Sequence, residues 1–309
     1  MNNIQLQEAS KKAAKAKFHG HPTLKCRTIP RYPDTAEREF KRLTNAYVKM
    51  LNAELKKELP AIMREYSQSR EDGIREDASR DFRKGLSDAF LRVMERLDVK
   101  IEDFGLRDRA AAIARMTRNN SLREWKRAVH DTLGIDLLGD YYSAEFYEQY
   151  LRQWIDQNVL KIKSIPNEML DDMRDIIMDG YLKGRPIRDL QREIQEQYNV
   201  TKHKAQMLAR DQVATLNSQL CQAQQRDAGV SKYRWSTSHD SRVRDCHAEL
   251  DGKVFSWDDP PEMWYETQSR GTVYTGRHCH PGEDYCCRCV AIPVFDFDNL
   301  SIPMAGEKK

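Results

Sequence analysis

The spacing of apolar residues along the chain changes at Gly229. Before it, apolar side chains such as Leu51 and Leu55 recur at steps of three or four residues, which places them on one face of an α-helix. After it, Tyr233 and Trp235 alternate with polar residues, which is typical of a β-strand. The sequence therefore predicts a mainly α N-terminal region followed by a small α+β C-terminal module with few short strands.

The apolar stripes predict a series of helices before Gly229. We expect them over residues 34–59, 70–97, 106–133, 146–162, 166–181, 187–194 and 202–228. Pro60 is expected to weaken or kink the first helix, and the third is expected to be interrupted at residues 119–121. Pro166 is expected to begin a helix that ends at residues 184–186. Gly229 is well placed to cap the last helix in a left-handed conformation.

Three later segments have the residue pattern of strands. We expect them over residues 233–237, 253–257 and 290–295. Because Pro293 cannot donate a backbone hydrogen bond, the third strand is expected at a sheet edge. Residues 299–309 are expected to form a loose tail.

The charge of the chain is unevenly distributed. The net charge is only +3, so the chain as a whole does not favour nucleic acid. Residues 1–33, however, hold one acid and a group of basic side chains that could bind phosphates. The candidate DNA-binding residues are Lys11, Lys12, Lys15, Lys17, Lys25, Arg27 and Arg31. A solvated flexible tail is the alternative interpretation of this arm.

The distribution of apolar residues argues against a membrane protein. No apolar run approaches the roughly 20 residues needed to cross a bilayer. The lysine-bearing N-terminus has no apolar segment after it, so it does not read as a secretory signal. The sequence therefore predicts a protein of the producing cell's cytoplasm that has no membrane partner.

Cysteine and histidine residues gather near the C-terminus. Cys286 and Cys289 have the Cys-x-x-Cys spacing of a zinc knuckle, and thiolate with imidazole favours zinc over other metals. The candidate ligands are Cys286, Cys289, Cys279 and His280, with His247, Cys246, His278 and Cys287 as alternatives. The other interpretation is that Cys287 and Cys289 are small buried residues beside a strand.

A run of charged residues around His247 has two interpretations. In an enzyme, His247 is a candidate general base oriented by Asp240, and a bound metal would then suit phosphodiester cleavage. In the favoured interpretation, Arg242 and Arg244 form salt bridges that hold a turn to neighbouring carboxylates. A nuclease of the ββα-metal kind also needs a second His or Asn at helical spacing, which does not follow His247.

The order of these residues resembles a known family. The motif reads Tyr233-x-Trp235-x-Thr237-x-x-Asp240-x-Arg242-Val243-Arg244-x-x-His247-x-x-Leu250-Asp251-Gly252, followed by His280-Pro281-Gly282-Glu283 and Cys287-Arg288-Cys289. Together with residues 154–166 and 205–212, it resembles the phage head morphogenesis proteins, the Mu F-like minor capsid proteins. The resemblance covers about residues 140–296. Asp211-Gln212 departs from the family's frequent Thr-Glu, and Cys246 and Cys286 are additional thiols.

The resemblance implies a structural protein of the virion and not an enzyme. Its expected partners are the portal protein, capsid or scaffold proteins and packaged double-stranded DNA, during prohead assembly in the host cytoplasm. A role in DNA packaging or ejection is also implied. The metal-dependent nuclease remains the alternative function, and a delivered toxin-like module is the least favoured one.

The resemblance also suggests how the chain is divided. We expect a basic flexible arm at residues 1–33, a helical region at 34–140 and the helical part of the head-morphogenesis domain at 141–229. An α+β Cys/His-rich module follows at 230–298, and the tail occupies 299–309. The motif network that we expect to hold this module comprises Trp235, Thr237, Asp240, Arg242, Arg244, His247, Asp251, Gly252 and Arg288.

Overall fold

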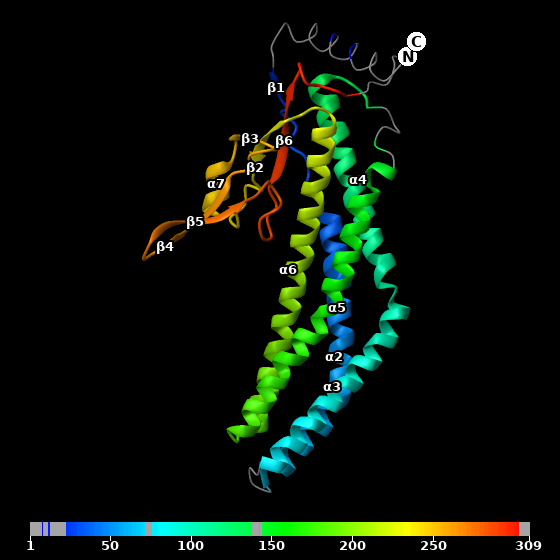
Figure 1. The fold of residues 1–309 in the computed structure, drawn as a ribbon, viewed down its shortest axis with the longest axis vertical. Coiled ribbons are helices and arrows are strands. Elements are labelled where there is room, and N and C mark those ends of the chain that lie inside the picture. The colour runs from blue at the N-terminus through cyan, green and yellow to red at the C-terminus, as the bar shows by residue number, and fades with distance from the viewer. Residues whose placement is uncertain are drawn as a thin grey trace. The chain divides into compact units, whose positions relative to one another are not determined.

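Two compact units, each assembled from non-consecutive segments, make up the structure (Figure 1). The computed structural model describes Glu8, Lys12 and residues 23–71, 76–137, 142 and 144–302. The sheet unit comprises Met1–Glu37, Ile113–Trp154 and Arg210–Lys309. The helix unit comprises Arg38–Ala112 and Ile155–Ala209.

Long helices account for most of the chain before Gly229. Within the described ranges there are five: α2 (Asp34–Glu71), α3 (Glu76–Phe104), α4 (Leu106–Leu133), α5 (Ala144–Leu182) and α6 (Ile187–Asp227). The predicted α-rich N-terminal region is therefore confirmed. In the described part of the chain, no helix combines the length and apolar character needed to cross a bilayer.

Some of the predicted helix breaks were wrong. α4 runs through residues 119–121 and α5 contains Pro166, whereas the break at residues 184–186 is confirmed between α5 and α6. α2 includes Pro60 and extends to Glu71, and the weakening or kink expected at Pro60 stays a prediction. The two helices expected at 187–194 and 202–228 form the single helix α6. Each break was inferred from local propensity, but packing on both sides of a weak residue keeps a helix continuous. In α6, Tyr198 packs against a buried cluster, which ties the intervening turn to the helix unit.

Aromatic contacts form part of the core of the helix unit. Phe82 and Tyr181 stack with ring centroids 4.5 Å apart, and Tyr66 meets both edge-on. The Tyr66 hydroxyl lies 2.8 Å from the carbonyl oxygen of Gly180 and 2.7 Å from that of Arg185. These contacts join α2, α3 and the end of α5, and Phe82 and Tyr181 belong to the predicted apolar stripes.

The sheet unit contains a four-stranded antiparallel sheet. Its order is β1-β6-β2-β3, formed by β1 (Thr23–Lys25), β6 (Val290–Asp296), β2 (Lys232–Ser236) and β3 (Val254–Ser256). Three of these strands match the predicted segments, so the small α+β module is confirmed. β1 was not predicted, because residues 1–33 were expected to form an arm, and the strand is only three residues long.

The edge position predicted for β6 was wrong, because β6 lies between β1 and β2. The carbonyl of Pro293 accepts a hydrogen bond from the Cys26 amide at 3.3 Å, on the β1 side. The N–H and C=O of one residue in an antiparallel strand point to the same neighbour. The missing N–H of Pro293 would therefore point toward β1, just beyond Lys25, where the paired residues of β1 end. No hydrogen bond to β2 is lost.

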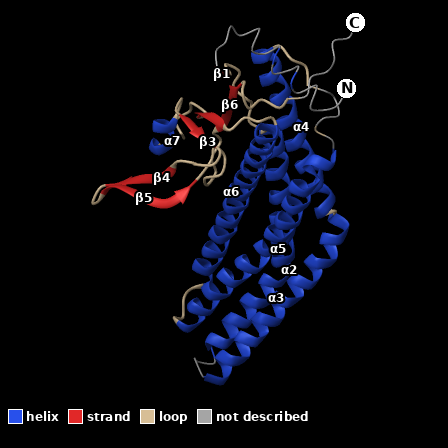
Figure 2. Cartoon of the chain, turned by 45° about the horizontal axis from the view of Figure 1, so that its top comes forward, coloured by secondary structure: helices blue, strands red, loops and turns tan. Residues whose placement is uncertain are grey.

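A separate hairpin and one short helix complete the sheet unit. Figure 2 shows the hairpin of β4 (Glu262–Thr267) and β5 (Gly271–His278) in red, with α7 (Asp245–Leu250) in blue. The sequence analysis missed both hairpin strands. Most residues of β5 are exposed, so they show no alternation of apolar and polar side chains.

The chain after β6 also differs from the prediction. Leu300 and Ile302, which lie in the expected loose tail, are buried. The Ser301 amide donates to the carbonyl of Ala228 at 3.0 Å. Gly229 has the predicted left-handed conformation, with φ +77°, and a side chain there would collide with the carbonyl of Asn299. The start of the tail is thus fixed at the end of α6, while residues 303–309 lie outside the described residues.

Candidate functional site

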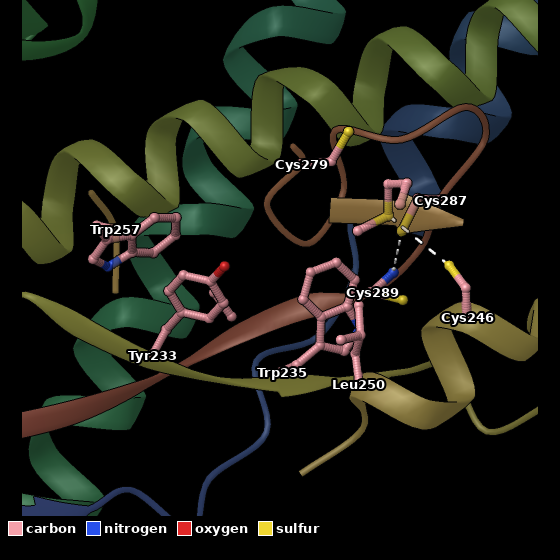
Figure 3. Close-up of a cluster of buried hydrophobic side chains, with 10 residues drawn as sticks. Tyr233, Trp235, Cys246, Leu250, Trp257, Cys279, Cys287 and Cys289 are labelled. Atoms are coloured by element: carbon pink, nitrogen blue, oxygen red, sulfur yellow. Dashed lines mark hydrogen bonds between the residues drawn. The ribbon is translucent and has the colours of Figure 1, made fainter. Parts of the chain in front are cut away.

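Part of the predicted motif lies in a buried cluster of the sheet unit. Its members are Tyr233, Trp235, Cys246, Leu250, Trp257, Met263, Cys279, Cys287, Cys289 and Ala291. In Figure 3, Tyr233 and Trp257 lie together on one side of Trp235, and the sulfur atoms gather on the other. Tyr233 and Trp257 have ring centroids 4.4 Å apart. The cluster therefore has an aromatic part and a thiol-rich part.

His247 lies at the centre of the thiol-rich part. α7 buries it beside Trp235, with ring centroids 5.6 Å apart. Its Nδ1 lies 3.7 Å from the Sγ of Cys287 and 3.7 Å from the Sγ of Cys289. Its Nε2 lies 3.2 Å from the Oδ2 of Asp284. One imidazole thus contacts two thiols through one nitrogen and a carboxylate through the other.

Asp284 is held by charges as well as by His247. Arg244 forms an ion pair with its Oδ2, and Arg277 lies 2.9 Å from its Oδ1. Burial raises the pKa of Asp284, but the hydrogen bond from His247 and the charge of Arg244 outweigh it and lower this pKa to about 2. The carboxyl group is therefore ionised at neutral pH.

The pKa values of the imidazole of His247 and of the two thiols are shifted as well. Burial lowers the pKa of His247, but Asp284 and Cys287 outweigh it and raise this pKa to about 9. The thiol of Cys289 and the imidazole of His247 hold the pKa of Cys287 well below its usual range, while that of Cys289 is raised. The thiol-rich part therefore favours one thiolate beside a positively charged imidazole.

The charged residues before α7 form a salt-bridge network. Asp240 accepts hydrogen bonds from Arg242 at 2.9 Å and from Arg288, which lower the pKa of Asp240. Arg244 instead joins Asp284 and the carbonyl of Tyr285. Asp284 therefore occupies the position beside His247 that the enzyme interpretation gave to Asp240.

Other residues of the motif fix the backbone around β2. The Thr237 amide donates to Oδ1 of Asp251 at 2.8 Å. The Gly252 amide donates to the carbonyl of Trp235 at 2.9 Å, and Gly252 has φ +76°, which favours glycine. These contacts join the end of β2 to the turn after α7, and so position Trp235 and His247.

The candidate metal ligands fall into separate places. Among the described residues, the only group of three or more His, Cys, Asp or Glu side chains close enough to share an ion is His247, Cys287 and Cys289. Cys289 was among the first-choice ligands, whereas His247 and Cys287 were alternatives. Of the other candidates, Cys246 lies 4.0 Å from the sulfur of Met263.

The remaining candidates have other contacts. His280 lies 3.0 Å from the hydroxyl of Tyr233, and burial lowers its pKa. Burial raises the pKa of Cys279 to about 11, and its amide donates to the carbonyl of Pro261. His278 is exposed and contacts the carbonyl of Pro260. The Cys286 amide donates to Asp211 at 3.1 Å, so the departure from the family pattern at Asp211 has a structural role here.

Asp284 is a site residue that the motif does not mark. It lies between the two motif segments that end at Glu283 and begin at Cys287, and no spacing rule relates it to His247, 37 positions earlier. The preference of an isolated histidine for a carboxylate partner does not say which carboxylate it will be. Only the fold, which brings α7 beside the turn before β6, identifies Asp284.

Part of the candidate DNA-binding arm can be located. Lys12, Lys25, Arg27 and Arg31 are exposed. Lys11, Lys15 and Lys17 lie outside the described residues, and DNA binding stays a prediction.

Long helices and a small Cys/His-rich α+β module define the structural class of this protein. Residues 171–292 match the family described as Phage Mu protein F like protein. This match supports the resemblance to the phage head morphogenesis family that the motif predicts. No solved structure matches the chain at a significant level.

Two curated proteins are similar to the chain. An uncharacterized protein of Haemophilus influenzae is 36% identical over 163 residues, which are 53% of this chain and 33% of the relative. The minor head protein GP7 of Bacillus phage SPP1 is 25% identical over 142 residues, which are 45% of this chain and 45% of the relative. Each alignment thus covers less than half of the relative's own length.

Proposed function

We propose that the protein is a minor head protein of a phage virion that acts with the portal protein during prohead assembly. The observation that carries this proposal is the family match of residues 171–292, together with the similarity to a minor head protein. Capsid or scaffold proteins are further partners in this proposal. A contribution to DNA packaging or ejection belongs to the same proposal, with the exposed Lys25, Arg27 and Arg31 as part of the DNA-facing surface.

Exposed apolar residues on the helix unit support an assembly role. Leu91 and Val99 on α3 and Leu160 on α5 are 59%, 68% and 68% exposed. Leu91 and Val99 lie about two turns apart on α3, and exposed apolar residues at helical spacing can dock into a groove of a partner protein. We propose that this surface contacts the portal or scaffold protein.

The experiment is assembly of proheads from co-expressed major capsid, scaffold and portal proteins of the encoding phage, with this chain present. Proheads are purified by sedimentation, and the chain is quantified by mass spectrometry. We expect incorporation in few copies that is lost when the portal protein is omitted. Absence of the chain from portal-containing proheads would contradict the proposal.

Two variants test the contact surface. Leu91→Glu and Val99→Glu place charges on the proposed docking surface, and we expect each to lower incorporation at least several-fold. Val200→Glu on α6 is a matched control, because it makes the same valine-to-glutamate change at an exposed position of another helix. Equal incorporation of all three variants would assign the contact to another surface.

A metal-dependent nuclease is the alternative function. Asp240 is engaged by Arg242 and Arg288, and the second His or Asn that a ββα-metal nuclease needs at helical spacing does not follow His247. We therefore propose a structural and not an enzymatic role. Conversion of supercoiled plasmid to nicked or linear DNA in added magnesium, lost in His247→Asn, would instead support the nuclease.

A further inference from the structure

Three side chains of the sheet unit are arranged like the ligands of a tetrahedral metal ion. The Nδ1 of His247 lies 3.7 Å from each of the sulfur atoms of Cys287 and Cys289, and all three atoms lie within 4.8 Å of one another. In a tetrahedral zinc site, Zn–S and Zn–N bonds of ordinary length put nitrogen and sulfur about 3.6 Å apart. The two nitrogen–sulfur distances therefore match those of one tetrahedral zinc ion.

The surroundings of His247 orient it as a metal ligand. The Oδ2 of Asp284 lies 3.2 Å from Nε2, so when a metal ion replaces the proton on Nδ1, the remaining proton on Nε2 faces this carboxylate and the lone pair of Nδ1 is directed toward the two sulfurs. A carboxylate on the far nitrogen is the usual outer partner of a zinc-bound histidine. Arg244 and Arg277 in turn fix Asp284 by ion pairs.

The backbone around the two cysteines also suits thiolate ligands. The amide of Cys289 donates to the sulfur of Cys287 at 3.3 Å. The amide of Cys287 donates to the carbonyl of Asp284 at 3.0 Å, so one turn positions both the ligand and the outer carboxylate. Two thiolates would balance the charge of Zn²⁺, which lowers the cost of burying the ion.

The three side chains leave one coordination position of a tetrahedral site open. A pocket of ≈ 130 Å³ adjoins them, and its lining includes His247, Cys287, Cys289, Arg242, Arg244 and Arg288. The three arginines have carboxylate partners in Asp240 and Asp284. A water molecule from this pocket is therefore the simplest fourth ligand.

We propose that His247, Cys287 and Cys289 bind one Zn²⁺ ion, whose fourth position faces the arginine-lined pocket. The ion joins α7 to the turn before β6, because His247 precedes Cys287 by 40 positions and Cys289 by 42. The ion thereby adds a link between short elements of the sheet unit, which otherwise pack around the small buried cluster. This inference does not depend on the proposed role in head assembly.

The first experiment measures metal in the purified full-length protein. We expect about one zinc per chain by elemental mass spectrometry. Cobalt exchanged into the site should give the intense visible bands of a four-coordinate ion and the near-ultraviolet absorption of thiolate ligands. Wild-type protein that folds without zinc and takes up neither metal would overturn the proposal.

Variants then assign the ligands. His247→Asn, Cys287→Ser and Cys289→Ser should each lower zinc affinity strongly, and Asp284→Asn should lower it by roughly 10–100-fold through the orientation of His247. Cys286→Ser, Cys279→Ser and Cys246→Ser are the matched controls and should retain the metal. If Cys246→Ser lost as much zinc as Cys287→Ser, Cys246 would be a ligand, and the proposal of an open fourth position would be overturned.

A second measurement serves if the ligand variants do not fold. The wild-type protein is alkylated before and after addition of a strong chelator, and the modified cysteines are mapped by peptide mass spectrometry. Chelation should raise the modification rate of Cys287 and Cys289 at least tenfold, with a much smaller change at Cys286. Equal rates with and without chelator at Cys287 and Cys289 would contradict the metal site.

Discussion

Different kinds of contact stabilise the inside of the helix unit and the inside of the sheet unit. The helix unit relies on long apolar stripes, stacked aromatic rings and one buried charge network around Glu54. The sheet unit joins short strands through a cluster of tryptophan, tyrosine, histidine and cysteine side chains. The core residues of the helix unit recur at regular spacing along the sequence, whereas those of the sheet unit are far apart in it.

A property of the sequence allows the two units to be followed separately. All five tryptophans lie in segments of the sheet unit. Tryptophan fluorescence therefore reports on that unit, whereas far-ultraviolet circular dichroism reports mainly on the long helices of both. Each substitution below is expected to move one of these signals more than the other.

The largest effect is expected for Tyr233→Ala. Tyr233 is fully buried, packs on Trp257 and contacts His280, so its removal leaves a cavity in the sheet unit. We expect a loss of about 3–5 kcal/mol in the free energy of unfolding. Urea titration should show this loss in tryptophan fluorescence, with Phe82→Ala in the helix unit as the matched control. Equal shifts of both signals in both variants would show that the units unfold together.

A stabilising effect is expected for Pro60→Ala. Pro60 is exposed inside α2, where it removes one helical hydrogen bond and packs little. Alanine should raise the stability of the helix unit by up to about 3 kcal/mol. The midpoint of urea unfolding followed by circular dichroism measures this gain. An unchanged or lower midpoint would indicate that α2 needs the bend that proline favours.

The next effect concerns pH. Hydrogen bonds from Lys100 and Lys57, assisted by Arg96, lower the pKa of Glu54 from 4.5 to about 2. A carboxyl group whose pKa is lower in the folded state stabilises above its unfolded pKa, and this contribution is lost as pH falls from about 4.5 toward 2. Glu54→Gln should cost about 2 kcal/mol at neutral pH. Its unfolding midpoint should vary less with pH than the wild type's over that window, and parallel curves would refute the network.

The smallest effect is expected for Tyr66→Phe. The hydroxyl of Tyr66 contacts the carbonyls of Gly180 and Arg185, whereas its ring contacts would remain. Loss of one buried hydrogen bond should cost about 1 kcal/mol. The change should be visible by circular dichroism and absent from tryptophan fluorescence. A loss as large as that of Tyr233→Ala would mean that the helix unit also depends on single long-range contacts.

Buried residues of the helix unit could be predicted from the sequence more completely than the contacts of the sheet unit. Residues such as Phe82 and Tyr181 recur with helical spacing, so their burial could be predicted without knowing their partners. The motif likewise marked His247, Cys287 and Arg288. It did not reveal Asp284 or the grouping of the two cysteines around one imidazole, since these depend on how α7 meets the turn before β6.

From the sequence alone follow the change from helices to strands at Gly229, the position of the Cys/His-rich module and its resemblance to a family. Periodicity and motif order are properties of neighbouring positions, so they can be read along the chain. The folded structure is needed to place Pro293 in an inner strand, to bury Leu300 and Ile302, and to pair Asp284 with His247. The physical reason is that each of these facts depends on the free energy of contacts between segments that are far apart in sequence.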